Sequence, residues 1–133
     1  MVRECGASAP SARRRAPSCR AEAARPHPRP RPITAGLDGV DASLLRDIEA
    51  AGADAIEVGI PFSDPVMDGR TIQEASQRAL EIGATPSSII ADLAALDVDV
   101  PIAVMTYYNP VHHMGHERFA QNLAGSGVDG AIE

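Results

Sequence analysis

The chain has 133 residues, of which 44% are hydrophobic and 23% charged, as expected for one globular domain. Its net charge of −6 is uneven: residues 1–32 carry eight Arg and two Glu (+6), whereas residues 33–133 carry four Arg and sixteen acids (−12), so the body of the chain repels the phosphates of nucleic acids. No apolar run approaches the roughly 20 residues of a membrane-spanning helix, which argues against a membrane protein. The two cysteines, Cys5 and Cys19, suggest no disulfide framework and fit a reducing, cytoplasmic compartment.

Residues 1–32 form an Arg- and Pro-rich segment that we expect to be disordered, because it has no helical or strand periodicity. Three explanations for it stay open. It is a transit peptide, which would place the protein in an organelle, or a basic interaction tail. Alternatively, because the chain has twelve Arg and no Lys, it is a translation of GC-rich DNA that lies upstream or out of frame.

From Ile33 onward, buried runs alternate with amphipathic stretches. A short strand is predicted over Ile33–Gly36, followed by a helix that ends near Gly52. Ala55–Ile60 is a run of small and β-branched residues that ends before Pro61 and predicts a buried strand.

The second half of the chain continues the same alternation. After a loop over residues 62–69, the spacing of apolar residues predicts helices over 71–82 and 85–96. It then predicts a strand over 101–107, a helix over 117–124 and a strand over 128–132, with a loop between residues 107 and 117.

This pattern predicts an α/β fold with a parallel sheet and crossover helices. No G-x-G-x-x-G follows the first strand, which argues against a dinucleotide-binding sheet. The remaining architecture is a (β/α)8 TIM barrel, which needs about 250 residues for eight units. We therefore expect residues 33–133 to form about four parallel βα units, a partial TIM barrel corresponding to the N-terminal half of such a domain.

Three carboxylates gather around the second predicted strand and the loop after it. Alternation along the strand puts Glu57 on the face opposite Ile56 and Val58, which points it to a barrel interior. Such a pocket makes ionisation costly and favours the protonated form that a general acid needs. A Glu at a strand end satisfied by solvent is the alternative, and the spacing leaves both open. Asp64 and Asp68 follow in the loop.

The stretch E-V-G-I-P-F-S-D-P-V-M-D-G from Glu57, followed by T-I-Q, resembles the signature segment of the tryptophan synthase α chain family. P-I-A-V-M-T-Y-Y-N-P-V from Pro101 and G-V-D-G-A-I from residue 127 are similar to the third strand and the start of the fourth strand of that family. The resemblance implies a lyase that cleaves indole-3-glycerol phosphate to indole and glyceraldehyde 3-phosphate.

The resemblance also implies roles for individual residues. Glu57 would be the acid–base group that protonates carbon 3 of the indole ring. Asp68 would accept a hydrogen bond from the ring nitrogen and stabilise its developing charge. Tyr107 would lie near the substrate, and Met105 and Ile72 would line the indole pocket, although plain core packing also explains these two.

Partner and cofactor expectations follow from the same resemblance. Pro61, Asp64 and Asn109 would face a tryptophan synthase β subunit. The pyridoxal phosphate of the family belongs to that β subunit, so the α chain would need no cofactor of its own.

Some features depart from the family pattern. Pro32 stands where the first strand of the family presents an aromatic residue, and Arg70 replaces the Pro that usually follows D-G. The phosphate-binding loops of such barrels follow the seventh and eighth strands, so we expect a polypeptide of these residues to be inactive alone. The alternatives are an inactive chain that at most binds a β-type partner, or another phosphate-binding barrel enzyme such as an epimerase or isomerase.

His112, His113 and His116 form a cluster that we place in the loop after the third strand. No further His, Cys or paired acid completes a metal site near them, so no metal ligand is assigned.

Overall fold

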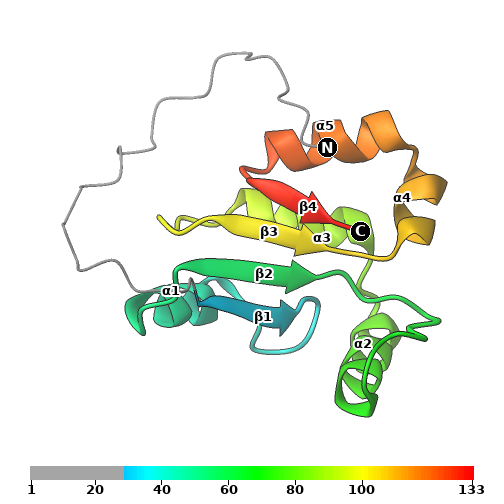
Figure 1. Ribbon diagram of the computed structural model, residues 1–133, viewed down its shortest axis with the longest axis horizontal. Coiled ribbons are helices and arrows are strands. Elements are labelled where there is room, and N and C mark those ends of the chain that lie inside the picture. The colour runs from blue at the N-terminus through cyan, green and yellow to red at the C-terminus, as the bar shows by residue number, and fades with distance from the viewer. Residues whose placement is uncertain (1–28) are drawn as a thin grey trace.

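The structure is a computed structural model that describes residues 29–133, and the predictions made for residues 1–28 lie outside that range. The described residues form one sheet with helices along it (Figure 1). In chain order the elements are β1 (Pro30–Thr34), α1 (Ala42–Ala50), β2 (Ala55–Gly59), α2 (Arg70–Ile82), α3 (Pro86–Ala94), β3 (Ile102–Met105), α4 (Tyr108–Met114), α5 (His116–Gly125) and β4 (Gly130–Ile132).

The four strands pair in sequence order, β1-β2-β3-β4, and every pair is parallel. Helices connect them, as parallel neighbours require. The predicted run of parallel βα units is therefore confirmed.

The hydrophobic core lies on one face of this sheet. Ile56, Val58 and Val104 point to this face and are at most 1% exposed. Side chains from α1, α3, α4 and α5 cover them, among them Leu45, Leu93, Val111 and Phe119. Each of these fully buried side chains stabilises the fold by roughly 1.5–3 kcal/mol, so this single layer of helices accounts for most of the packing.

The opposite face of the sheet, which we call the open face, carries the alternate residues of each strand. None of them is buried. Glu57 and Ala103 are half-buried, and Met105 and Ile132 are 38% and 47% exposed. The side chains that alternation predicted to point away from the helices do so.

β1 begins earlier than the sequence pattern predicted, at Pro30 instead of Ile33. Ala35 donates its N–H to the Gly59 carbonyl, and Ile33 and Arg31 share that side of the strand with Ala35. The backbone nitrogens of the intervening Pro30 and Pro32 therefore point away from β2, so their missing N–H groups cost no hydrogen bond to β2. Arg and Pro suggested a chain without structure, but pairing with β2 overrides that composition.

The predicted loop after the third strand is wrong. The segment predicted as a loop contains α4, in which Val111 is the one buried residue. Such a short helix gives almost no apolar periodicity, and Pro110 lies in its first turn, where proline is tolerated. β3 correspondingly ends at Met105, before the predicted end at Tyr107.

Local signals in the sequence fix the turns. Gly36, directly after β1, has a φ of +78°, and a Cβ there would lie 2.5 Å from the Cβ of Ala84, so only glycine fits. Thr85 forms a capping box with Ser88 at the start of α3, with Pro86 in the first turn. Within residues 29–133, no helix has the length and apolar content needed to cross a membrane.

Candidate active site at the carboxyl ends of the strands

The strand register aligns the predicted site residues in rows across the open face. Glu57 lies beside Pro32 of β1 and Ala103 of β3. One step further along the strands, Gly59 lies beside Thr34 and Met105. Glu57 is thus one row below the carboxyl ends of the strands, where parallel α/β proteins place their sites.

Small residues surround Glu57 on this face. Its neighbours along β2 are Ala55 and Gly59, and its neighbour on β3 is Ala103. The Glu57 carboxylate is half-buried and has no hydrogen bond or ion pair with any residue in the described range 29–133. A carboxyl group with space beside it and no partner is free to exchange a proton with a bound molecule.

Asp68 is held in the loop after β2 by Tyr107, which follows β3. The Tyr107 hydroxyl donates a hydrogen bond to Asp68 Oδ2 at 3.2 Å and accepts one from the Met67 N–H at 3.1 Å. The Tyr107 ring also stacks on Phe62, with centroids 5.0 Å apart. Two predicted site residues that lie 39 positions apart in sequence are therefore brought into contact.

Gln73 of α2 holds the same loop from another side. Its Nε2 donates to the Pro65 carbonyl at 3.1 Å and to the Asp68 carbonyl at 2.9 Å. The turn between these two residues is closed by the Asp68 N–H, which donates to Pro65 O at 3.1 Å. The loop is thus tied to the first part of α2 as well as to the end of β3.

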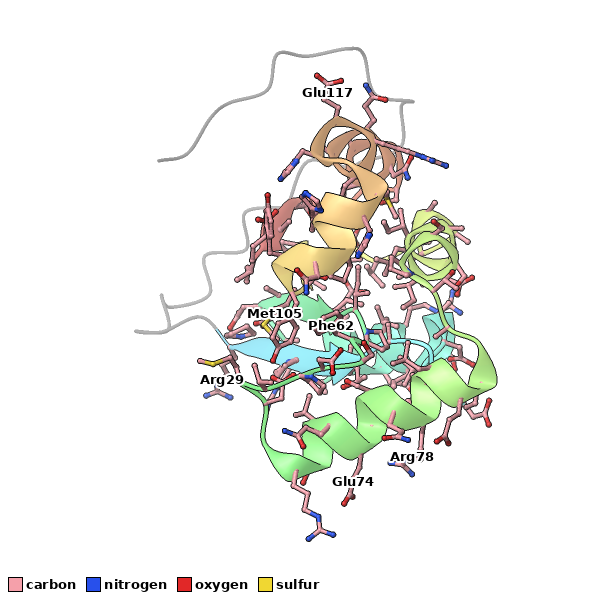
Figure 2. All side chains as sticks on the ribbon, turned by 90° about the vertical axis from the view of Figure 1, so that its right-hand side faces the viewer. Arg29, Phe62, Glu74, Arg78, Met105 and Glu117 are labelled. Atoms are coloured by element: carbon pink, nitrogen blue, oxygen red, sulfur yellow. The ribbon has the colours of Figure 1, made fainter. Side chains whose placement is uncertain are left out.

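The two residues expected to line an indole pocket lie on different elements. Met105 ends β3 on the open face, next to Ile132 of β4 in the register. Figure 2, which faces the carboxyl ends of the strands, shows Met105 and Phe62 there. Ile72 is in the first turn of α2 and 44% exposed. Met105 thus forms an apolar surface in the row beside Gly59.

The residues expected to face a partner differ in their exposure. Asp64 and Asn109 are exposed, whereas Pro61 is buried within the chain. Val66 and Met67, at the tip of the same loop as Asp64, are 81% and 85% exposed. Adjacent large apolar side chains with this exposure are typical of a contact surface, and no spacing in the sequence indicated their exposure.

The histidine cluster lies in helices. His112 and His113 belong to α4 and His116 begins α5, and the Tyr108 ring lies 5.8 Å from the ring of His112 and 5.4 Å from that of His116. Within residues 29–133, no three His, Cys, Asp or Glu side chains are placed to hold one metal ion.

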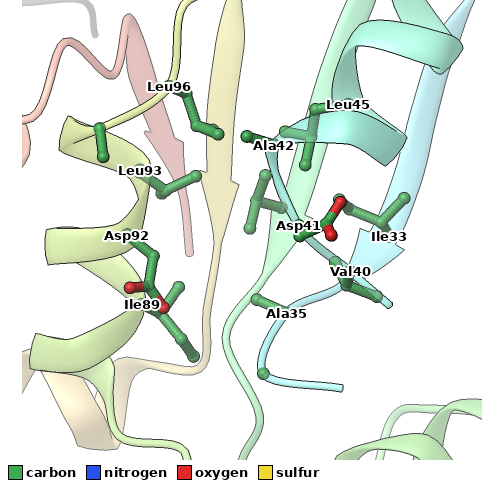
Figure 3. A pocket seen from close by; sticks show the side chains of 13 residues that line it. Ile33, Ala35, Val40, Asp41, Ala42, Leu45, Ile89, Asp92, Leu93 and Leu96 are labelled. Carbon is green, nitrogen blue, oxygen red and sulfur yellow. The ribbon is translucent and has the colours of Figure 1, made fainter. Parts of the chain in front are cut away.

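The cavities formed by residues 29–133 include the following two. One of about 360 Å³ opens between α1 and α3, with Asp41 and Asp92 among its apolar lining (Figure 3). It lies on the helical side of the sheet and includes no predicted site residue. The other, of about 450 Å³, lies between the loop after β2 and α2 and is bordered by Phe62, Pro65 and Gln73.

Sequence reasoning missed two residues that shape the Asp68 loop, Phe62 and Gln73. Phe62 is one of only two phenylalanines in a chain with few aromatic residues, which is a weak signal. Gln73 belongs to the T-I-Q that carries the resemblance, but nothing in the sequence indicates its role, because its partners are backbone carbonyls whose position depends on the folded loop.

Comparisons with known proteins identify the family to which the sequence is similar. The sequence profile of the family described as tryptophan synthase alpha chain matches residues 32–132. The tryptophan synthase alpha chain of Granulibacter bethesdensis is 50% identical over 105 residues, covering 75% of this chain and 38% of the relative. That of Methanosarcina mazei is 48% identical over 102 residues, with the same coverage of 75% and 38%.

Solved structures give the same result for the fold. Tryptophan synthase subunit alpha from Legionella pneumophila superposes with a TM-score of 0.75 at 34% identity, over 79% of this chain and 42% of that chain. Tryptophan synthase from M. tuberculosis gives a TM-score of 0.71 at 38% identity, over 79% and 44%. The four βα units thus match part of a TIM barrel.

The curated relatives extend well beyond the matched region, since the chain spans about 38% of their length. Within that span, sequence and fold agree over all four strands. The chain belongs to the tryptophan synthase alpha chain family.

Proposed function

We propose that this chain carries the acid–base residues of a tryptophan synthase α reaction, the retro-aldol cleavage of indole-3-glycerol phosphate into indole and glyceraldehyde 3-phosphate. The observation that supports this most is the hydrogen bond that holds Asp68 on Tyr107, at the end of a sheet whose open face carries Glu57, which has no hydrogen bond or ion pair with residues 29–133. Two carboxyl groups in different environments suit a reaction that needs one acid and one anion.

In the proposed reaction Glu57 donates a proton to carbon 3 of the indole ring. Asp68 accepts a hydrogen bond from the ring N–H and stabilises the positive charge that develops there. The bond from carbon 3 to the side chain then breaks, and its electrons return to the ring. The adjacent hydroxyl loses its proton and becomes the aldehyde, and Glu57, now ionised, is the base that takes this proton.

The test is Glu57→Gln in a full-length protein that contains this segment. The amide keeps the shape but cannot exchange the proton, so indole release should fall by about 10²- to 10⁴-fold while folding and substrate binding persist. Glu74→Gln, a change to an exposed residue paired with Arg70, is the matched control and should leave the rate unaltered. A Glu57→Gln rate within about threefold of the parent would remove Glu57 from the mechanism.

We also propose that the loop tip docks on a tryptophan synthase β chain, since the related structure from M. tuberculosis is one of tryptophan synthase. Asp64 and Asn109 are exposed and would contact the β chain. Val66 and Met67 would supply the apolar part of that contact. The reaction itself would then need no cofactor, with pyridoxal phosphate in the partner.

A pull-down with a β chain tests this docking. Asp64→Ala should weaken the capture of the β chain, whereas Asp92→Ala, a change on α3 away from the loop, should not. Equal capture by both variants would place the contact elsewhere. If the chain captures the β partner but Glu57 has no catalytic role, the non-enzymatic alternative holds.

A further inference from the structure

Gln73 occupies a position that neither the proposed chemistry nor the partner contact uses. It is the fourth residue of α2, and its side-chain nitrogen lies at the base of the turn between Pro65 and Asp68. Both of its contacts there are carbonyl oxygens, which only accept hydrogen bonds. The amide nitrogen is therefore the only end of the side chain that fits, and it uses both of its N–H groups.

The contact fixes the main chain of Asp68, and a second contact fixes its side chain. Gln73 Nε2 donates to the Asp68 carbonyl at 2.9 Å, and Tyr107 donates to the Asp68 carboxylate at 3.2 Å. These two residues come from different elements, the start of α2 and the segment after β3. A residue whose main chain and side chain are held from two different elements has lost most of its freedom before any ligand arrives.

From this geometry we propose that Gln73 is a positioning residue for Asp68, and that it keeps the loop after β2 in the conformation in which the Asp68 carboxylate can accept the N–H of an indole ring. The proposal rests on the proposed function for the identity of the ligand. The two hydrogen bonds of Gln73 to the loop, which we call the clamp, depend only on the contacts between α2 and the loop.

Hydrogen exchange on the chain tests the clamp independently of any ligand. The reporters are the amides of Asp68 and Met67, which donate to Pro65 O and to the Tyr107 hydroxyl. Gln73→Leu should speed their exchange by about tenfold, the effect expected from losing about one net hydrogen bond. The amide of Val104, in the core strand β3, should keep its rate, which excludes a general loss of stability.

Matched variants separate hydrogen-bond donation from packing. Gln73→Glu keeps the shape but replaces the donor with an oxygen, so it should loosen the loop as much as Gln73→Leu does. Gln73→Lys supplies a donor to the same carbonyls and should restore most of the protection. Gln77→Leu, one turn further along α2, removes only a contact with Glu81 and should change nothing in the loop. Equal exchange in all four variants would overturn the proposal.

NMR measurements of indole and N-methylindole binding then test whether Asp68 is positioned to accept the N–H of an indole ring. If Asp68 accepts the ring N–H, Asp68→Asn and Gln73→Leu should both weaken indole binding severalfold, and neither should change the binding of N-methylindole, which lacks that N–H. Weaker indole binding in Asp68→Asn but not in Gln73→Leu would overturn the positioning role. Unchanged indole binding in Asp68→Asn would instead count against the proposed function, and the exchange experiment would still decide the clamp.

Discussion

At the scale of single residues, Asp41 links local structure to pH. It precedes α1, and its carboxylate accepts hydrogen bonds from the Ser43 hydroxyl at 2.6 Å and from the N–H groups of Ser43 and Leu44 at 2.9 and 3.1 Å. The Ser43 hydroxyl first, and then the backbone N–H groups, lower the pKa of Asp41 below its ordinary value of 3.8. Asp41 therefore caps the helix best when it is ionised.

This lowered pKa gives a prediction with a definite sign. A carboxyl group whose pKa is lower in the folded chain stabilises the fold fully above the unfolded-state value of 3.8, and that contribution is lost as the pH falls through the folded-state pKa. Asp41→Ala should thus be less stable than the parent near neutral pH, and the difference should shrink below pH 3.8. Urea unfolding at about pH 6 and about pH 3 measures it.

Asp41→Asn is the control for that experiment, because it keeps an acceptor for the same N–H groups but does not titrate. Its stability relative to the parent should depend on pH only in the range where Asp41 loses its charge. A gap between Asp41→Ala and the parent that is constant from neutral to acid pH would show that ionisation of Asp41 contributes nothing.

Among the helices and strands, the sequence predicted those that follow from the pattern of apolar residues. It missed those that depend on contacts with other elements. β2 and β3 are runs of small and apolar residues interrupted only by Glu57, and α2 has a clear apolar stripe, so their existence followed from the sequence pattern. α4 is too short for a stripe, and Pro30 could not be assigned to β1 without knowing which side of that strand β2 would occupy.

The site divides in the same way. Glu57 was placed on the correct face by alternation alone, since its strand has a single register with respect to the core. The contact of Asp68 with Tyr107 spans 39 residues, which no local spacing predicts. The resemblance to a family identified both Asp68 and Tyr107 as site residues. It did not predict that Tyr107 holds Asp68, nor that Gln73 holds the loop.

Within residues 29–133, no strand pairs with the edge of β1 that faces away from β2, and this free edge leads to a prediction. Pro30 and Pro32 both face this edge, which removes two of the N–H donors that an added strand would need. Replacing both by Thr restores the donors, each worth about 0.5–1.5 kcal/mol net, so the double variant should self-associate at roughly tenfold lower protein concentration. Sedimentation velocity of parent and variant over a concentration series measures the change.

Arg31→Thr is the matched control. The backbone of residue 31 pairs with β2, so this substitution raises β-propensity without adding a donor to the free edge. The control should associate like the parent. If it associates as strongly as the double variant, strand propensity and not the missing donors limits assembly through β1.

At the scale of the whole molecule, the described residues present a sheet covered on one side only (Figure 1). On the open face, Met105 and Ile132 are well exposed and Glu57 is half-exposed to solvent. A carboxyl group in such surroundings is screened by water, whereas acid–base catalysis in this type of barrel relies on an enclosed and largely dry pocket.

We therefore predict that a polypeptide of these 133 residues releases no measurable indole from indole-3-glycerol phosphate. Binding energy from the remote phosphate normally holds the reacting carbon against the acid and the base. In TIM barrels that phosphate binds in loops after the seventh and eighth strands, whereas β1 to β4 provide the first four. Without that anchor, Glu57 and Asp68 meet the indole ring only transiently, even though Tyr107 and Gln73 keep Asp68 in place.

The measurement is an indole-release assay on the purified polypeptide, alone and with a β chain. The control is the same polypeptide examined by hydrogen exchange, because a protected Val104 amide establishes that the sheet has folded and that absent turnover is not absent structure. Turnover at an ordinary enzyme rate of about 1–10³ s⁻¹ would contradict the prediction. It would mean that four strands and the Asp68 loop position the substrate without a phosphate site, and that the clamp on Asp68 makes a large contribution to catalysis.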